Sequence, residues 1–399
     1  VVNRFVLRNA IRVHMLQPDL QRLFHGALLR RFLSGTAANS YPQKIAFPSR
    51  CYNGSEGEKR AREKYFHLLE KRICFICFTG NTCYYPFRHE EIKIPTGTKE
   101  LQDVMNVMPS CLADNSSTYR HLSTRFDARH GVFWCIMDPK GRPCFSIELL
   151  EELRAVEMEL ERYAGNIPRE DLPFRYFVFT SRTPGVFNYG GDLELFIRCM
   201  NSRDAAELRR YARLCIDVLH SYFMNFNLPI TTISLVQGDA LGGGFEAALG
   251  GDVIIAEKSA LFGFPEVLFN LFPGMGAYNF LSRRIGMART ERMILGGKTF
   301  RTEELLEDGV LDIVAEDGKG ENALYDYIGK HSRKRHVYES LSQVRRNTFP
   351  VRHEEMLEIS ELWVDTALRI GPREIRLMER LIKAQGKAPV PALSLQRAL

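Results

Sequence analysis

The sequence predicts an α/β protein, and three observations carry that prediction. An apolar, β-branched run at 230–238 ends in a glycine turn and is followed by a helix. A second strand-like run at 175–181 leads through the glycine-rich segment 185–191 into another helix near Leu193. Beyond Gly276 the hydrophobic spacing is mostly helical. Repeated strand, turn and helix units of this kind favour a layered α/β core followed by a helical region.

The remaining elements are predicted in chain order from their hydrophobic periodicity. We expect strands at 131–137, 252–256 and 310–314, in addition to those at 175–181 and 230–238. Helices are predicted at 147–162, 202–225, 278–285, 287–295, 302–309, 323–334, 354–369 and 372–384. The helix 202–225 has an apolar stripe that we interpret as core packing, made of Leu208, Tyr211, Leu214, Cys215, Val218 and Leu219.

The N-terminal part of the chain differs from the rest. The first fifty residues hold a single acid, Asp19, against seven arginines, six of which lie before residue 32 with apolar residues between them: Arg4, Arg8, Arg12, Arg22, Arg30 and Arg31. Such a segment resembles an amphipathic targeting peptide or a membrane-surface helix. Because the chain begins with valine and Met105 lies further in, our hypothesis is that this extension is mis-assigned or weakly ordered; native peptides upstream of Met105 in a mass spectrum would refute it. We therefore predict an extension at 1–112, a catalytic core at 113–318 and a helical region at 319–399.

The bulk composition narrows the class of protein. With 45% hydrophobic and 26% charged residues it is ordinary for a globular chain, and the net charge of +6 gives no case for nucleic-acid binding. No apolar run is long enough to span a bilayer. Nine cysteines, an odd number, predict no disulfide framework, and Cys74, Cys77 and Cys83 lack a second ligand pair. We expect a soluble cytoplasmic protein without a bound metal.

Two glutamates are the candidate catalytic residues. Glu246 lies in the first helical turn after the glycine triplet 242–244, where the helix dipole favours its ionised form. Glu266 follows a proline in an apolar segment, which should raise its pKa. Two carboxyls in differently biased surroundings suit acid–base chemistry at one carbon centre. Taken alone, a glycine triplet before a helix more often reflects close helix–strand packing.

The sequence around these residues resembles that of the crotonase (enoyl-CoA hydratase/isomerase) superfamily. Residues 235–249 (LVQGDALGGGFEAAL) and 265–278 (PEVLFNLFPGMGAY) are most similar to the diffusible signal factor synthases, bacterial enzymes that make cis-2-unsaturated fatty-acid signals. Residues 359–368 also resemble them, so the resemblance extends over about 119–387. It implies a crotonase-type ββα spiral core with a C-terminal helical region.

The resemblance also implies roles for residues. The backbone N–H groups of Gly191 and Gly243 would form an oxyanion hole, Glu266 would take the C2 proton, and Glu246 would act on the departing oxygen. The expected reaction is dehydration of a 3-hydroxyacyl thioester followed by thioester hydrolysis, which makes a quorum-sensing fatty acid. No cofactor is expected, because the substrate arrives as an acyl carrier protein or CoA thioester. Five apolar residues have the composition of an acyl pocket or, equally, of ordinary core: Leu268, Phe269, Leu271, Phe272 and Met275.

Several alternatives remain open. The same residues fit an enoyl-CoA hydratase or isomerase of fatty-acid degradation, or a module that binds acyl ligands or a sensor histidine kinase without turnover. The superfamily often forms trimers or hexamers. Asn270 and Asn279 depart from the synthase pattern without removing a carboxyl. The basic residues Arg333, Lys334, Arg335, Arg345 and Arg346 suggest a solvated helix face, with carrier docking as the second interpretation.

Overall fold

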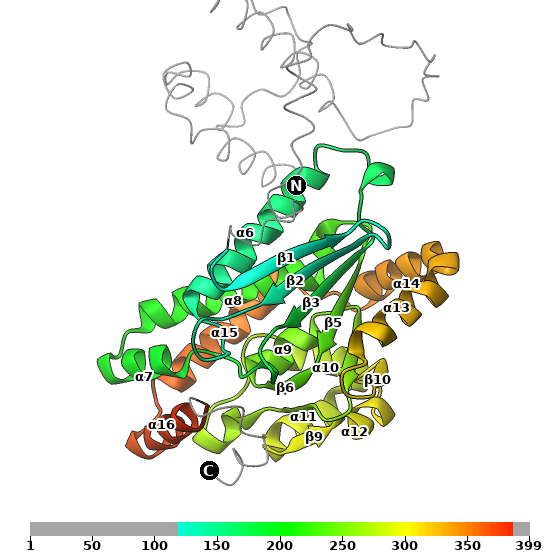
Figure 1. Cartoon of the computed structure of the whole chain (residues 1–399). Helices are drawn as coiled ribbons and strands as arrows, with labels where there is room; N and C mark the ends of the chain where they lie inside the picture. Colours follow the sequence, from blue (N-terminus) through cyan, green and yellow to red (C-terminus); the bar gives the residue numbers. More distant parts are fainter. Residues whose placement is uncertain (1–118, 386–399) are drawn as a thin grey trace, which may run out of the picture. The chain divides into compact units, whose positions relative to one another are not determined.

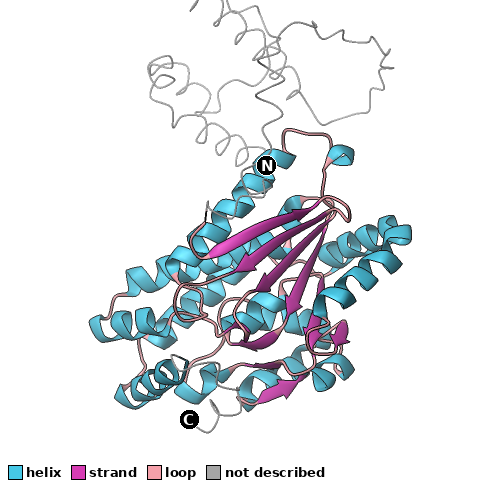
Figure 2. Ribbon diagram, in the orientation of Figure 1, coloured by secondary structure: helices cyan, strands magenta, loops and turns pink. Residues whose placement is uncertain are grey.

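The computed structural model describes residues 119–385. The predicted extension at 1–112 and the cysteines Cys74, Cys77 and Cys83 lie outside the described residues. Within them, two sheets and a set of helices form a layered α/β arrangement, as Figures 1 and 2 show. The predicted fold class is therefore confirmed.

The larger sheet has six strands in the order β1-β2-β3-β5-β7-β10. Its strands are β1 (Leu122–Asp127), β2 (Val132–Met137), β3 (Tyr176–Ser181), β5 (Thr231–Val236), β7 (Val253–Glu257) and β10 (Ile313–Ala315). All pairs are parallel except β1 with β2, a hairpin at the edge that the sequence analysis did not anticipate. One face packs against α6 (Ile147–Ala164) and α8 (Ala205–Phe223), and the other against α13 (Gly320–His331). This sheet is thus buried on both faces, as parallel sheets usually are.

A smaller sheet lies beside it, in the order β4-β6-β8-β9. Its strands are β4 (Gly185–Asn188), β6 (Gly238–Leu241), β8 (Leu261–Gly263) and β9 (Thr299–Arg301). The first three each follow a strand of the larger sheet and precede a helix: β3-β4-α7 (Leu193–Ser202), β5-β6-α9 (Gly243–Leu249) and β7-β8-η4 (Pro265–Phe269). This repeat is the expected ββα spiral. Most of these strands were not predicted, because three or four residues are too few to show a period.

The region beyond Gly276 is mostly helical, as expected. It contains α10 (Ala277–Ile285), α11 (Met287–Gly296), α12 (Thr302–Glu307), α13, α14 (Arg335–Thr348), α15 (His353–Ala367) and α16 (Pro372–Gln385). Helix α14 was not predicted. Its only fully buried residue is the polar Ser342, whereas Val337, Leu341 and Val344 on the same helix are each more than half exposed. Val337, Leu341 and Val344 stand at helical spacing, so the sequence did carry the signal for this helix and the prediction overlooked it.

The predicted helix 202–225 begins three residues later than expected. Helix α7 ends at Ser202, Arg203 takes a left-handed conformation, and Asp204 caps α8 by accepting a hydrogen bond from the N–H of Glu207.

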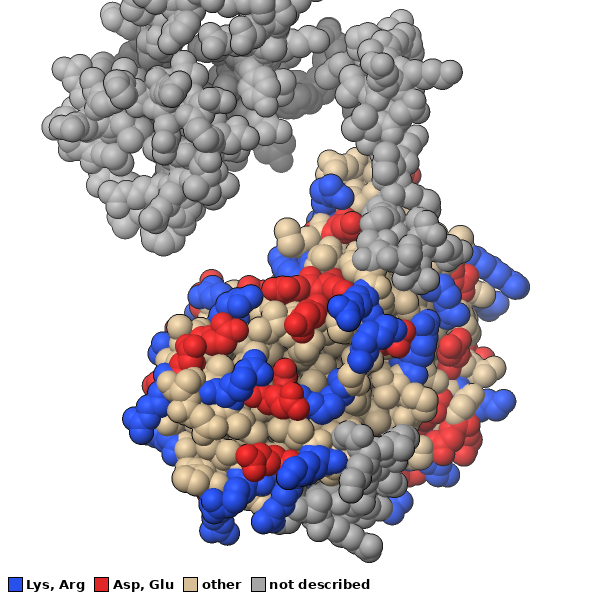
Figure 3. Space-filling view, turned by 60° about the vertical axis from the view of Figure 1, so that its left-hand side comes forward, with Lys and Arg blue, Asp and Glu red and all other residues tan. Residues whose placement is uncertain are grey.

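On the face shown in Figure 3, basic and acidic side chains are interspersed. Within residues 119–385, no helix has the length and apolar character that crossing a bilayer requires.

Candidate functional site

Three neighbouring strands bring the candidate residues together. β4 pairs with β6 and β6 with β8, all parallel, so their carboxyl ends meet at one edge of the smaller sheet. The segments that follow these strands hold Gly191, Gly243 and Glu266 respectively. Ligand sites in sheets of parallel strands lie at this edge. All three residues line one pocket, together with Glu246 from the helix after β6.

The two glycine turns approach each other at backbone distance. A Cβ on Gly190, whose φ is +94°, would lie 2.7 Å from the nitrogen of Gly243. The first turn is fixed by Asn188, whose Oδ1 accepts a hydrogen bond of 2.7 Å from the N–H of Gly190. Among the hydrogen bonds of residues 119–385, neither the N–H of Gly191 nor that of Gly243 has an acceptor. Two free donors therefore border the pocket.

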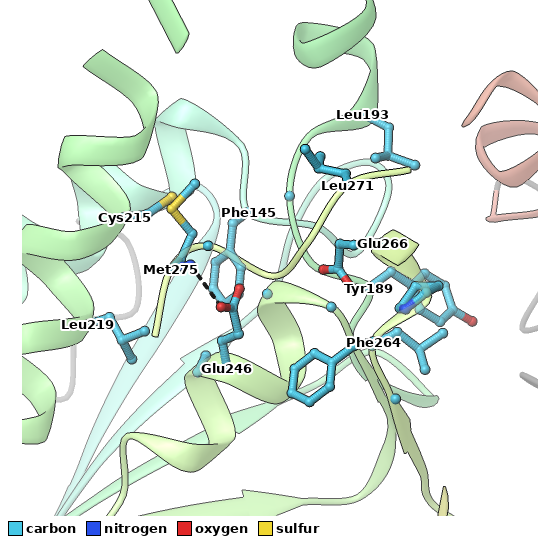
Figure 4. A pocket seen from close by; sticks show the side chains of 18 of the residues that line it. Phe145, Tyr189, Leu193, Cys215, Leu219, Glu246, Phe264, Glu266, Leu271 and Met275 are labelled. Atoms are coloured by element: carbon cyan, nitrogen blue, oxygen red, sulfur yellow. Dashed lines mark hydrogen bonds between the residues drawn. The ribbon is translucent and has the colours of Figure 1, made fainter. Parts of the chain in front are cut away.

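Glu246 is held by the backbone of the segment that precedes α10. Its Oε1 accepts hydrogen bonds from the N–H groups of Met275 (2.8 Å) and Ala277 (3.0 Å), the first of which is drawn in Figure 4. Burial raises the pKa of this carboxyl to about 7, and the backbone donors partly oppose that shift. The helix dipole was expected to favour the ionised form of Glu246, but desolvation dominates instead, because the side chain is only 2% exposed.

Glu266 reaches over the glycine triplet. A Cβ on Gly242 would lie 2.5 Å from its Oε1, so only glycine leaves room for the carboxyl there. Its Oε2 is buried and has no hydrogen-bond partner among the described residues. The residue as a whole is half-buried, but its carboxyl group is enclosed. Burial, and then the charge of Glu246, raise the pKa of Glu266 to about 8, in the predicted direction. In Figure 4 the two carboxyl groups enter the pocket from different elements.

The pocket wall is predominantly apolar. Of the five residues proposed for it, Leu268, Phe269, Leu271 and Met275 line the pocket and Phe272 does not. The stripe on α8 packs in the core as predicted, and four of its members also line the pocket, which was not predicted: Tyr211, Cys215, Val218 and Leu219. An apolar stripe looks the same in sequence whether it faces a side chain or a cavity.

The wall contributed by α6 was missed altogether. Leu150, Leu153 and Glu157 lie at helical spacing on its inward face and line the pocket. The available signal was Glu157 itself, an acid on an otherwise apolar face, and it is only 4% exposed.

A cationic hollow adjoins the pocket. It shares Leu268, Gly297 and Lys298 with the pocket, and the arginines of α16 complete it: Arg373, Arg376 and Arg380. The basic residues singled out in the sequence lie instead on η5 (Ser332–Lys334) and α14, and none of them lines either hollow. Within residues 119–385, no three His, Cys, Asp or Glu side chains are grouped as metal ligands would be.

Neither asparagine that departs from the synthase pattern lines the pocket. Asn270 occupies a left-handed position at the end of η4, which asparagine tolerates well. Asn279 is buried and donates a hydrogen bond of 2.6 Å to Glu355.

Comparison with known proteins gives one family. A family model described as enoyl-CoA hydratase/isomerase matches residues 138–333. Among similar solved structures, DspI from Pseudomonas aeruginosa is 23% identical with a TM-score of 0.51, covering 64% of this chain and 98% of its own. An enoyl-CoA hydratase from Bacillus halodurans is 21% identical (TM-score 0.55; 65% and 98% covered). Human mitochondrial delta3-delta2-enoyl-CoA isomerase is 20% identical (TM-score 0.54; 66% and 99% covered). At these identities the likeness shows a shared fold.

Proposed function

The chain belongs to the enoyl-CoA hydratase/isomerase (crotonase) superfamily, and from this premise we propose that it removes water from a 3-hydroxyacyl thioester and then hydrolyses the thioester, releasing a cis-2-enoic acid. The observation that carries the proposal is the pair of enclosed carboxyls, Glu246 and Glu266, beside two unpaired backbone donors in one apolar pocket. A double-bond isomerase can work with one carboxyl, whereas adding or removing water uses both an acid and a base.

The thioester carbonyl would bind between the N–H groups of Gly191 and Gly243. Loss of the C2 proton places negative charge on the carbonyl oxygen, and two fixed donors stabilise that charge without reorganisation. One such donor contributes about 3–4 kcal/mol in enzymes that use an oxyanion hole. The acyl chain would extend along the apolar walls formed by α6 and α8.

Elimination needs one ionised and one protonated glutamate. The Glu266 carboxylate takes the C2 proton, the C3–O bond breaks, and the proton of Glu246 leaves with the hydroxyl as water. Afterwards the two residues have exchanged their protonation states. The Glu246 carboxylate can then take a proton from a water that attacks the carbonyl carbon, and Glu266 returns its proton to the departing thiolate. One water is released, one is consumed, and both glutamates return to their starting states.

The pKa order bears on the direction of the first step. The pKa of Glu266, about 8, exceeds that of Glu246, about 7, so a single shared proton lies mainly on Glu266 before substrate binds. This arrangement suits water addition to an enoyl thioester, and it favours the enoyl-CoA hydratase as the second candidate. Moving the proton to Glu246 costs about 1.4 kcal/mol per pKa unit, a small fraction of a catalytic barrier.

The cationic hollow beside the pocket could bind the phosphate of the acyl carrier. CoA and the prosthetic arm of an acyl carrier protein both contain phosphate. Lys298 and the α16 arginines supply positive charge where the two hollows meet. This proximity supports a carrier thioester rather than a free fatty acid as the substrate.

The test is direct. Purified protein is incubated with a medium-chain 3-hydroxyacyl thioester of CoA or of acyl carrier protein, and the products are identified by mass spectrometry. We expect a free cis-2-enoic acid from the wild type and none from Glu246→Gln or Glu266→Gln.

The matched control is Glu257→Gln, which removes a buried carboxyl outside the pocket. The acceptor oxygen of Glu257, which bonds to Gln237 and Gly320, is retained in that variant. Reversible hydration of a trans-2-enoyl-CoA without free acid would identify a hydratase, and absence of both reactions would refute the proposal.

A further inference from the structure

Among the described residues, three carboxylic acids line the pocket, and the proposed chemistry uses only two of them. The third, Glu157, lies on α6 among apolar neighbours and is 4% exposed. Burial raises its pKa well above the ordinary value for a glutamate. A carboxyl is costly in such surroundings unless it is paired, so its presence in an acyl pocket calls for an explanation.

Glu157 lies well away from the oxyanion turns. Helices α6 and α8 run side by side in the same direction, since Glu151 contacts Arg210 (3.5 Å) and Glu161 contacts Ser221 (3.0 Å). At the near end, the hydroxyl of Tyr211 accepts a hydrogen bond from the N–H of Asp192, directly after Gly191. Seven residues separate Leu150 from Glu157 on α6, which is about 10 Å of helix. An acyl chain that starts at the oxyanion turns and follows α6 would therefore approach Glu157 with its methyl end.

Arg154 anchors this carboxyl and opposes the rise in its pKa. Nη1 of Arg154 lies 3.1 Å from Oε2 of Glu157, and its side chain is 32% exposed, whereas that of Glu157 is 5% exposed. The pair therefore extends from the pocket wall to solvent. Arg154 also lies 3.9 Å from Glu161, which fixes the guanidinium between two acids. An alkyl chain that reached further would strip the remaining solvation from the pair.

We propose that the Glu157 carboxyl, anchored by Arg154, forms a polar floor at the far end of the acyl pocket and sets the maximum length of the acyl chain. The inference rests on the proposed function in one respect, namely that the pocket binds an acyl chain. Removing the carboxyl should leave an apolar extension that admits longer chains. Each additional buried methylene should then raise the affinity roughly fourfold, which corresponds to about 0.8 kcal/mol.

Binding is measured with unreactive saturated fatty acids, so that the test does not depend on turnover. Trp363 lines the pocket, and its fluorescence reports occupancy. The probes are octanoic, decanoic, dodecanoic, tetradecanoic and hexadecanoic acids, added to the wild type and to Glu157→Ala. The chain length of tightest binding should increase by about two methylenes in Glu157→Ala, which predicts roughly fifteenfold tighter binding of that longer acid relative to the wild type.

Two control variants separate a floor from a merely structural role. Glu157→Gln keeps the size and polarity of the floor and should keep the wild-type length profile. Glu161→Ala removes the neighbouring acid, which does not line the pocket, and should also keep it. A uniform loss of affinity for all lengths in Glu157→Ala, or an unchanged profile, would overturn the inference.

Turnover of the matching 3-hydroxyacyl thioesters is measured in parallel. If the wild type binds the acids but does not turn over any thioester, the proposed function fails and the floor is still judged by the binding profile. If no acid binds the wild type at any length, the inference fails.

Discussion

Replacing Glu266 by glutamine should stabilise the protein, and the gain should grow as the pH rises. The carboxyl of Glu266 is enclosed, and burial raises its pKa from 4.5 to about 8. The folded state therefore binds this proton more tightly than the unfolded state does. Linkage then requires that the free energy of unfolding fall as the pH rises from 4.5 to about 8. Glutamine has the same shape and does not titrate, so it removes this loss.

The magnitude follows from the two pKa values. Between the unfolded pKa of 4.5 and the folded pKa of about 8, the stability falls by the same amount for each pH unit. The loss has therefore accumulated over about 1.5 pH units at pH 6, and it saturates at about 3.5 pH units above pH 8. The difference of about 2 units is equivalent to about 3 kcal/mol. The stability gained by Glu266→Gln should therefore be about 3 kcal/mol larger at pH 9 than at pH 6. Comparing the two conditions cancels any effect of the amide itself, provided that it does not depend on pH.

Urea unfolding of both proteins at pH 6 and pH 9, followed by circular dichroism, measures this difference. Product formation is assayed on the same samples and should be lost in the variant at either pH. A stability difference between the two proteins that does not change with pH would refute the reasoning. It would mean that the Glu266 carboxyl is solvated, and the case for a shared proton would fail with it.

Three further predictions concern the same site. The pH profile of kcat/KM should be bell-shaped with limbs near pH 7 and pH 8, because the reaction needs one carboxylate and one proton on Glu246 and Glu266 together; flat rates across this range would contradict the pair. Gly243→Pro removes one oxyanion donor at the first position of α9, so kcat should fall about 100- to 1000-fold. Gly243→Ala retains the N–H and places its Cβ 3.3 Å from the Cα of Gly190, so it carries a steric cost without loss of the donor; equal losses of kcat in the two variants would contradict the donor role. Gly242→Ala should lower kcat at least about 100-fold, since the new Cβ would displace the Glu266 carboxyl. It should also cost about 1–3 kcal/mol of stability, because the φ of this residue is +53°. A near-normal kcat together with a near-normal urea midpoint would show that the turn relaxes.

The sequence carried the local features of this site. The run of glycines at 242–244 indicated a turn with close backbone approach, and the structure gives Gly242 a positive φ beneath a carboxyl. The direction of the pKa shift of Glu266 was predicted from its apolar neighbours in the sequence, and the structure adds the charge of Glu246 as a second cause. Most helices and the longer strands were also predictable, since each has its own hydrophobic period.

Other properties could not be inferred because they depend on residues distant in the chain. The sheet pairing of β4 with β6 and of β6 with β8 is what places Gly191, Gly243 and Glu266 at one edge. The pKa of Glu246 was misjudged because its desolvation comes from segments packed around it, and this desolvation outweighs both the dipole of its own helix and its two backbone donors.

What lies opposite a given face is decided only when the chain packs. The stripe on α8 has the same composition whether it meets side chains or a cavity, and the structure alone shows that part of it borders the pocket. The same holds for Glu157, a single acid on an apolar helical face whose position in the pocket is set by the packing of α6 against α8 and the sheet. On helix α14 the apolar residues at helical spacing are exposed, and the buried contact is instead that of Ser342 with Asp252, ninety positions away in the chain. The sequence thus determined which groups are available, and tertiary packing determined which of them face one another, because burial and contact are properties of the assembled surfaces.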